Sequence, residues 1–356
     1  MGRQAERSGR EGAPRFSVVV PVYDVEAFLG PCLASLDAQT CQGFEVILVD
    51  DGSTDRSGAL CDAYAAGHGQ ATVVHKANEG QLLARREGIA RARGEYLVFL
   101  DADDGLRPDA LERIAAAIDA TGADIVAFGH CRAVEPAFAP AAPSPPGIEP
   151  GVLYEGQRYQ VVREAVASGL FNSLATKAVR RSLADEADYG AWKGLRHGED
   201  LFQLIPFVDA GRSLWSLDEV LYFYRDNPAS STGSFRPSQV QDLEAVCSRL
   251  DGYAAHWGGR CEAEARLMAC RHGRWLLAAL AEAPGSLEAK GPSLEAVRAL
   301  VVRHGAAPGA LGALGPALEM PLRLLLAGRF GAAMASARAF DGLYRAKERL
   351  GGRSGR

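Results

Sequence analysis

The sequence lacks the features that mark several specialised classes of protein. Its seven cysteines are scattered, odd in number and without a CxxC pair, which argues against a disulfide framework or a cysteine zinc site. It has no apolar run long enough to span a bilayer. The formal net charge of -5 is too small to indicate a nucleic-acid partner. We therefore expect a protein of the reducing cytoplasm that binds no nucleic acid.

Two common motifs for phosphate binding and acyl transfer are also missing. The sequence contains no GxxxxGKS/T loop and no nucleophile elbow followed by the other members of a catalytic triad. The first fifteen residues lack the apolar core of a signal peptide, so residues 1–15 are predicted to form a disordered, slightly basic tail. The composition, 47% hydrophobic and 23% charged over 356 residues, is that of a globular protein with room for two domains.

Short apolar runs alternate with helical patterns over the first 130 residues. The predicted strands cover residues 16–20, 44–49, 71–75, 95–100 and 124–129, and the predicted helices cover 25–39, 81–93 and 108–120. Pro31 is best placed in the first turn of a helix that begins near Gly30. This alternation predicts an α/β fold with a mostly parallel sheet, in which ligands bind at the carboxyl ends of the strands.

The second half of the chain changes in character. Residues 133–150 are rich in Pro and Ala and predict an irregular linker. Helices are predicted over 157–168, 177–183 and 201–210, a pair of short strands over 213–224, and long amphipathic helices over 239–256, 261–283 and 321–350. We place a domain boundary near Phe235, so that residues 16–235 form the α/β domain and residues 236–356 a C-terminal helical region.

Acidic residues follow two of the predicted strands. DDGSTD follows the second strand, where Asp51 could accept the imide N–H of a uracil ring, although a capped strand-to-helix turn uses the same residue types. DADD follows the fourth strand. On an extended segment Asp101 and Asp103 point to the same side and could hold a divalent cation that also binds a diphosphate. A solvated acidic turn before Pro108 is the alternative.

A third acidic group, Gly198-Glu199-Asp200, opens a predicted helix. A carboxylate there could serve as the general base for an acceptor hydroxyl. Simple helix capping and complementation of the helix dipole explain the same residues. Trp192 lies in the loop before this group and could either pack in the core or touch an acceptor sugar.

These three acidic groups, in this order, resemble family 2 glycosyltransferases of the GT-A fold, especially the bacterial cell-wall and polysaccharide enzymes. The resemblance runs from Phe16 to about Thr232, and the pairing of VDDGSTD with FLDADD in one sheet is its most specific part. The other matching stretches are SVVVPVYDVEAFLGPCLASLDAQT, HKANEGQLLARREGIARARGEY, TKAVRRSL, GED and VLYFYRDNPASS. The resemblance implies a Rossmann-like GT-A nucleotide-diphospho-sugar transferase domain over residues 16–235.

The resemblance also implies donor-binding roles for residues near the ends of the first four strands. They are Pro21, Val22, Tyr23, Asp51, Lys76, Arg85, Asp101, Ala102 and Asp103. The first three pack on the base and Asp51 holds its imide edge. Lys76 and Arg85 contact the nucleotide or diphosphate, and Asp101 approaches the ribose or donor sugar.

Metal and acceptor roles follow from the same resemblance. Asp103 binds Mn²⁺ or Mg²⁺, and Asp104 assists the metal or orients its waters. Asp200 is the catalytic base and Glu199 shapes the acceptor site. The segment that closes near the diphosphate or acceptor contains Tyr224 and Arg225. Three positions depart from the family pattern, because the usual Asn is replaced at Asp24, Arg86 and Thr176.

The predicted enzyme is a metal-dependent, inverting glycosyltransferase that moves a sugar from a nucleotide-diphosphate donor, UDP-linked by resemblance, to a hydroxyl of a polysaccharide, cell-wall or lipid-linked acceptor. Two alternatives belong to other classes. A nucleotidyltransferase would have a Gly-rich basic loop after the first strand, where this chain has Pro21-Val22-Tyr23-Asp24. A non-catalytic sugar-nucleotide-binding scaffold would not need both Asp103 and Asp200.

The last predicted helix, residues 321–350, is rich in Leu, Ala and basic residues. Such a helix could lie on an anionic membrane surface, which would place the protein peripherally on the inner face of the membrane. Packing against the catalytic domain, or against a second copy of the chain in a homo-oligomer, explains the pattern equally well.

Overall fold

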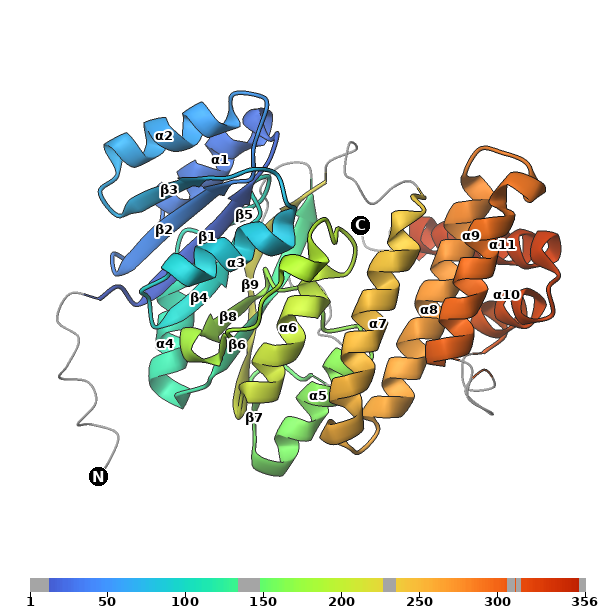
Figure 1. Ribbon diagram of the computed structural model, residues 1–356. Helices are drawn as coiled ribbons and strands as arrows, with labels where there is room; N and C mark the ends of the chain where they lie inside the picture. Colours follow the sequence, from blue (N-terminus) through green and yellow to red (C-terminus); the bar gives the residue numbers. More distant parts are fainter. Residues whose placement is uncertain (1–12, 134–147, 227–234, 306–310, 312–314, 352–356) are drawn as a thin grey trace. The chain divides into compact units, whose positions relative to one another are not determined.

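The computed structural model describes residues 13–133, 148–226, 235–305, 311 and 315–351 (Figure 1). Most of the predicted tail 1–15 and most of the predicted linker 133–150 lie outside these residues. The described residues form two compact units. The first comprises those of Met1–Val162 and Asn172–Pro228, and the second those of Arg163–Phe171 and Ala229–Arg356. A short piece of the chain, Arg163–Phe171, thus belongs with the C-terminal helices although it lies well before residue 235 in sequence.

Four parallel strands form the first half of the sheet in the first unit, in the order β3-β2-β1-β4. They are β1 (Phe16–Val22), β2 (Phe44–Asp50), β3 (Ala71–His75) and β4 (Tyr96–Phe99). All residues of β1, β2 and β4 are buried, as expected for strands covered on both faces. The pairing of Val22 with Asp50, and of Asp50 with His75, brings the carboxyl ends of three strands to one edge.

Helices cover both faces of this half of the sheet (Figure 1). One face packs on α1 (Glu26–Asp37), α2 (Ser57–Gly67) and α4 (Ala110–Thr121), and the other on α3 (Gln81–Arg91) and α6 (Glu199–Ala210). Helix α3 lies so close to β1 that a Cβ atom at Gly88 would come within 2.4 Å of Val19 Cγ1. Glycine at this position lets α3 approach the sheet. The predicted α/β architecture is therefore confirmed, with α3 and α6 on the same face.

The second half of the sheet is mixed. The full order is β3-β2-β1-β4-β8-β6-β9-β5, with β7 beside β9. Strand β8 is antiparallel to both β4 and β6, while β6 and β9 are parallel. The new strands are β5 (Gly105–Leu106), β6 (Ile125–Ala133), β7 (Leu153–Glu155), β8 (Lys177–Arg180) and β9 (Ser213–Arg225). The parallel sheet expected from the sequence thus describes the first four strands, and the rest adds antiparallel pairs.

Two predicted elements in this half were wrong. Residues 177–183 were predicted as a helix but form strand β8 followed by a short 3₁₀ turn, Arg181–Leu183. Ala178 and Val179 are fully buried because β8 pairs with strands on both sides, and a short apolar run gives no periodicity that separates strand from helix. Residues 213–224 form one long strand whose register with its partner β6 shifts twice, where two short strands were predicted.

Helix α1 begins at Glu26, four residues before the predicted start, so Pro31 lies inside it. Its first amide groups are satisfied by another turn, since Ser57 Oγ accepts from Val25 N at 2.9 Å and Asp55 Oδ2 from Glu26 N at 3.0 Å. Hydrogen bonds to Asp55 and Ser57 therefore let the helix start before the position at which the proline would otherwise place its first turn. The first unit also contains two 3₁₀ turns, Gly156–Tyr159 and Gly190–Trp192, and the first residues of α5 (Gln160–Ala167).

The second unit is helical, as predicted. Its main helices are α7 (Ser238–Trp257), α8 (Cys261–Glu282), α9 (Leu287–Leu300), α10 (Pro316–Leu326) and α11 (Phe330–Gly351). The last predicted helix is broken in two at Gly328, whose φ of 72° ends α10 in a conformation that favours glycine. Leu322 and Leu325 of α10, with Ala333 and Ala337 of α11, are buried in the core of this unit. Within the described residues, no helix has both the length and the apolar character that crossing a bilayer requires.

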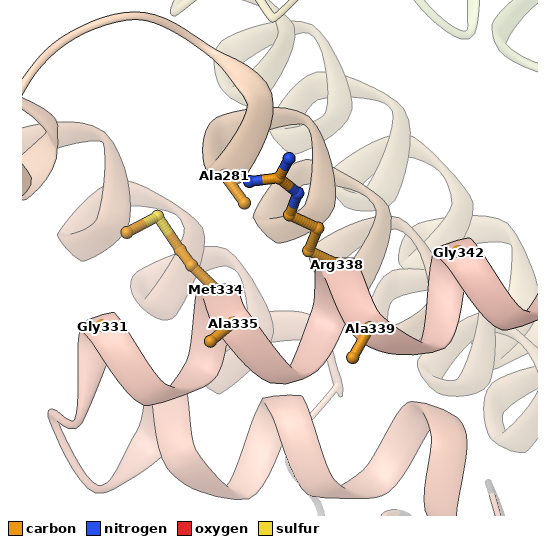
Figure 2. A pocket seen from close by; sticks show the side chains of 7 residues that line it. All are labelled: Ala281, Gly331, Met334, Ala335, Arg338, Ala339 and Gly342. Carbon is orange, nitrogen blue, oxygen red and sulfur yellow. The ribbon is translucent and has the colours of Figure 1, made fainter.

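A shallow hollow of about 580 Å³ lies on the second unit between α8 and α11 (Figure 2). Its lining consists of small residues with one methionine and one arginine: Ala281, Gly331, Met334, Ala335, Arg338, Ala339 and Gly342. None of the predicted site residues lines it, and it offers no carboxylate. The candidate chemistry therefore lies in the first unit.

Candidate active site

The carboxylate of Asp51 lies just beyond β2 and is almost fully buried. Lys76 Nζ donates to Oδ1 at 2.8 Å, the Glu79 amide donates to Oδ1 at 3.0 Å, and the Gly80 amide donates to Oδ2 at 2.7 Å. Burial alone would lower the pKa of Lys76, but Asp51 and Glu79 outweigh it and raise that pKa. A carboxylate has about four lone-pair positions, so Asp51 keeps one for a further donor such as a base N–H.

The rest of the DDGSTD turn is used inside the protein. Asp50 Oδ1 accepts from the Ser53 amide at 2.9 Å and Oδ2 pairs with His75 Nδ1 at 2.8 Å. Gly52 has a φ of 75°, and a Cβ there would lie 2.8 Å from Asn78 N. The capped-turn interpretation thus holds for most of this motif, which leaves Asp51 as its member directed at the Lys76–Gly80 segment.

The turn also fixes the segment after β1. Asp24 has a φ of 49°, a left-handed conformation in which Asn is more common, and its Oδ1 accepts from the Thr54 amide at 2.7 Å. Pro21 and Val22 are buried, whereas Tyr23 is 44% exposed. Tyr23 is therefore the side chain of this predicted base-packing group that offers an open aromatic surface.

Arg85 joins the second and third acidic groups. Its Nη2 donates to Asp101 Oδ1 at 2.8 Å and its Nη1 forms a short ion pair with Asp200 Oδ1. The guanidinium is fully buried; burial would lower the pKa of Arg85, but Asp200 and then Asp101 raise it well above its ordinary value. The structure thus brings DADD and GED, about 100 residues apart in sequence, onto one cation.

The DADD segment is a turn and not the extended segment predicted from sequence. The Asp104 amide donates to the Asp101 carbonyl at 3.0 Å, so Asp101 and Asp103 do not alternate along a strand. The turn is held by β9, because Tyr222 Oη donates to Asp104 Oδ2 at 2.6 Å and the Arg225 amide donates to Oδ1 at 2.9 Å. Ala102 is buried beneath it.

Asp103 and Asp104 are the members of this turn that were predicted to bind or assist a divalent cation. Among the hydrogen bonds between described residues, none reaches its carboxylate from another residue, whereas both oxygens of Asp104 are in use. Burial and the charge of Asp101 raise the pKa of Asp103, and they raise the pKa of Asp104 to about 8. A cation would relieve this repulsion. No three His, Cys, Asp or Glu side chains of the described residues converge as a complete metal site, so the remaining ligands would have to come from substrate or water.

Asp200 and Glu199 open helix α6, as predicted from the GED sequence. Asp200 Oδ2 accepts from the Leu174 amide at 3.0 Å, in addition to the ion pair of Oδ1 with Arg85. Burial, and then the negative charge of Asp200, raise the pKa of Glu199. The two adjacent carboxylates therefore differ, with Glu199 favouring the protonated form and Asp200 held against a guanidinium.

The predicted closing segment lies at the end of β9. Arg225 Nε donates to the Asp103 carbonyl at 2.9 Å, so this residue does contact the acidic turn. Tyr224 instead lies under the guanidinium of Arg132, 5.0 Å from ring centroid to carbon.

Three residues that sequence reasoning did not assign also contact the acidic groups or are affected by their charge. Gln81 Nε2 donates to Asp101 Oδ1 at 2.7 Å, and Tyr222 Oη bridges Asp104 to the Asp101 amide, which lies 3.2 Å from it. Lys177 is fully buried in β8, and the negative charge of Asp200 partly offsets the lowering of its pKa by burial. Gln81 precedes Arg85 by one helical turn, a spacing that could have pointed to it. Tyr222 and Lys177 become neighbours of the site only through strand pairing.

Lys177 predicts an unusual dependence of stability on pH. Burial lowers its pKa to about 7, against about 10.4 for an unfolded lysine. Between these values the unfolded chain binds a proton that the folded chain does not, so this residue lowers stability as pH falls from about 10 to about 7, and the loss then levels off. Replacing Lys177 with Met is expected to raise the free energy of unfolding at pH 7 by on the order of 2 kcal/mol.

The gain in the free energy of unfolding that Lys177→Met brings should be smaller at pH 10 than at pH 7. Urea unfolding at both pH values measures it. The matched control is Lys193→Met, because the side chain of Lys193 is 58% exposed. This variant should show no pH-dependent gain in stability. A loss of stability for Lys177→Met at pH 7 would contradict the expectation.

The chain is similar in sequence to known glycosyltransferases. The model of glycosyl transferase family 2 matches residues 17–166. The uncharacterized glycosyltransferase EpsJ of Bacillus subtilis (strain 168) is 32% identical over 264 residues, which cover 73% of this chain and 76% of EpsJ. The glycosyltransferase GlyG of Streptococcus pneumoniae serotype 4 is 40% identical over 111 residues, 31% of this chain and 37% of GlyG.

Solved structures show the same fold. Residues 1–349 of TarS from S. aureus, in complex with UDP-GlcNAc, match with a TM-score of 0.67 at 19% identity, covering 94% of this chain and 92% of that one. The same TarS segment in complex with UDP matches with a TM-score of 0.62 at 20% identity and equal coverage. The likeness extends over the helical C-terminal region as well as the α/β unit.

Proposed function

Because the chain belongs to glycosyl transferase family 2 and is a glycosyltransferase, we propose that it moves a sugar from a UDP-linked donor to a hydroxyl of a polysaccharide, cell-wall or lipid-linked acceptor. The observation that carries this proposal is the buried Arg85, which binds Asp101 of the DADD turn and Asp200 of the GED group. A donor-side acid and a candidate base are thereby held on one guanidinium.

The proposed donor site begins at Asp51. Its remaining lone pair would accept the imide N–H of uracil, Lys76 would hold the carboxylate in place, and Tyr23 would pack on the ring. Support for a uridine nucleotide also comes from the fold relative TarS, whose structures contain UDP-GlcNAc or UDP. Arg225, which lies beside the acidic turn, would contact the diphosphate.

The proposed reaction is an inverting, in-line displacement at the anomeric carbon. The acceptor oxygen forms the new bond while the bond from that carbon to the diphosphate oxygen breaks, and Asp200 takes the acceptor proton. A divalent cation, Mn²⁺ or Mg²⁺, held by Asp103 would act as a Lewis acid that neutralises charge on the departing nucleotide. Asp104, which accepts a hydrogen bond from Tyr222 of β9, would assist the metal or orient its waters.

A screen of nucleotide sugars tests the donor proposal. UDP-GlcNAc, UDP-glucose, UDP-galactose, GDP-mannose and dTDP-rhamnose are each added with Mn²⁺ or Mg²⁺, and melting temperature and sugar release are measured. A UDP-sugar at about 100 times its Kd is expected to stabilise the protein by about 2.7 kcal/mol. The matched variant Lys76→Met should weaken this response.

The outcome separates the alternatives. A larger response to GDP- or dTDP-sugars would contradict the uridine assignment. Strong binding without sugar release or transfer would favour a non-catalytic scaffold, and pyrophosphate release from a nucleoside triphosphate and a sugar phosphate would favour a nucleotidyltransferase.

Contact with a membrane surface is a further part of the proposal. Arg323 of α10, Arg329 of the turn between the helices and Arg338 of α11 are exposed and could meet anionic lipid. The buried leucines of α10 serve the core of the helical unit instead. A peripheral position on the inner face of the membrane would suit a lipid-linked acceptor. The alternative is that these helices pack against a second copy of the chain in a homo-oligomer.

A further inference from the structure

The segment of residues 184–198 leads directly into Glu199 and Asp200, and its fold is largely irregular. Its only regular element is the 3₁₀ turn Gly190–Trp192. Residues in such a segment take their position from side-chain contacts and not from backbone ladders. What holds this segment therefore also decides where an acceptor approaching Asp200 would lie.

Arg86 of helix α3 is the main anchor of this segment. Its Nη1 donates to Asp185 Oδ1 at 2.9 Å and its Nη2 donates to the Asp185 carbonyl at 2.6 Å. The guanidinium lies over the ring of Tyr189, 4.3 Å from its centroid, and Tyr189 Oη donates to Asp185 Oδ2 at 3.0 Å. The three side chains form a closed set of contacts that requires a planar, multiply donating cation.

This anchor continues into helix α6. Tyr189 is almost fully buried and meets Phe202 edge-on, with ring centroids 5.9 Å apart. Trp192 packs on the same Phe202 at 4.9 Å and on Tyr189 at 5.8 Å. Phe202 is fully buried two residues after Asp200. A change at Arg86 would therefore reach both the segment and the turn of α6 that carries the candidate base.

A second attachment connects the segment to the donor side. The Gly194 amide donates to the Glu79 carbonyl at 2.9 Å, and Lys193 Nζ lies 3.2 Å from the Glu79 carboxylate. The Glu79 amide in turn donates to Asp51. The two consecutive arginines of α3 therefore have different partners. Arg85 binds Asp101 and Asp200, and Arg86 binds the segment of residues 184–198 that precedes Asp200.

We propose that Arg86 is a positioning residue for the acceptor: it fixes residues 184–198 so that the acceptor hydroxyl is held against Asp200. This inference rests on the proposed glycosyl transfer. Arg86 contacts neither the acidic turn nor Asp51, and the contacts of Gly194 and Lys193 with Glu79 do not involve it, so its loss should affect acceptor placement and leave the donor site intact.

The test compares Arg86→Ala with Arg86→Lys, which keeps the charge but loses the planar fork, and with Arg91→Ala. Arg91 is an exposed arginine of the same helix paired with Glu87, and serves as the matched control. Amide hydrogen exchange of residues 184–198, UDP affinity, hydrolysis of UDP-GlcNAc by water, and transfer to methyl glycosides of glucose, galactose and N-acetylglucosamine are measured.

Arg86→Ala should speed exchange in residues 184–198 and raise the acceptor KM by about tenfold or more, the equivalent of losing about 1.4 kcal/mol of positioning. UDP affinity and hydrolysis should stay near wild type, Arg86→Lys should fall between, and Arg91→Ala should match wild type. Unchanged exchange in the segment, or an equal loss of UDP affinity and acceptor use, would overturn the inference. If wild type neither binds nor hydrolyses UDP-sugars, the proposed function fails by itself, and the exchange result still decides whether Arg86 holds the segment.

Discussion

Replacing Asp200 with Asn is expected to lower kcat by about 10²–10⁴-fold while UDP affinity stays close to wild type. The substitution keeps the size of the side chain and can keep the contact with the Leu174 amide, but it removes the group that would accept the acceptor proton. Asp51 and Lys76 contact each other and not Asp200, and Arg85 keeps its hydrogen bond to Asp101 when Asp200 is replaced, so donor binding should survive. Single-turnover transfer and calorimetric titration with UDP measure the two quantities.

Glu199→Gln is the matched control, because it changes the adjacent carboxylate in the same way. Burial and the charge of Asp200 raise the pKa of Glu199, so that side chain favours the protonated form near neutral pH and is the poorer base. Its amide variant should lose much less kcat than Asp200→Asn. If Asp200→Asn turns over near the wild-type rate, or if Glu199→Gln is the more damaging change, Asp200 is not the base.

Asp103→Asn is expected to remove the dependence of UDP binding on Mn²⁺, with a loss of affinity of about 10–100-fold in the presence of the metal. A coordinating carboxylate that is deprotonated and supplies charge cannot be replaced by a neutral amide without such a loss. Titration of UDP with and without Mn²⁺, together with electron paramagnetic resonance of Mn²⁺ in the presence of UDP, measures binding independently of turnover. Equal UDP affinity with and without metal in the wild type would remove Asp103 from this role.

Asp104→Asn separates metal binding from support of the fold. Both oxygens of Asp104 accept hydrogen bonds, from Tyr222 Oη and the Arg225 amide, and an amide side chain has only one oxygen that can accept either of them. This variant should lose about 1–3 kcal/mol of stability and keep its response to Mn²⁺. Loss of the Mn²⁺ response without loss of stability would assign the metal to Asp104 instead.

The elements that the sequence predicted well are those whose signal is local. Strands β1 to β4 are apolar runs bounded by turn residues, and Ala71–His75 was predicted with its observed ends. Strand β8 was predicted as a helix because four residues carry no usable period, and its strand conformation comes from β4 and β6 on either side. The same pairing buries Lys177 beside the site, which no feature of the TKAVRR stretch indicates.

In the candidate site, too, some features follow from local sequence and others only from strand pairing. Asp51, Asp101 and Asp200 were singled out by residue type and position after strands or at a helix start, and the structure connects the last two through Arg85. Their roles in donor binding and catalysis remain predictions. The extended form expected for DADD was wrong because β9, more than 115 residues later, supplies Tyr222 and the Arg225 amide that fold it into a turn.

The sequence by itself determined the family, the α/β pattern of the first unit and the order of the three acidic groups, since each depends on residues close together in the chain. Only the tertiary structure decided which carboxylates already accept hydrogen bonds within the described residues, and which contacts Arg85 and Arg86 of α3 each make. These depend on strand pairing and burial, and burial is what turns a side chain of given chemistry into a charged, protonated or ion-paired group.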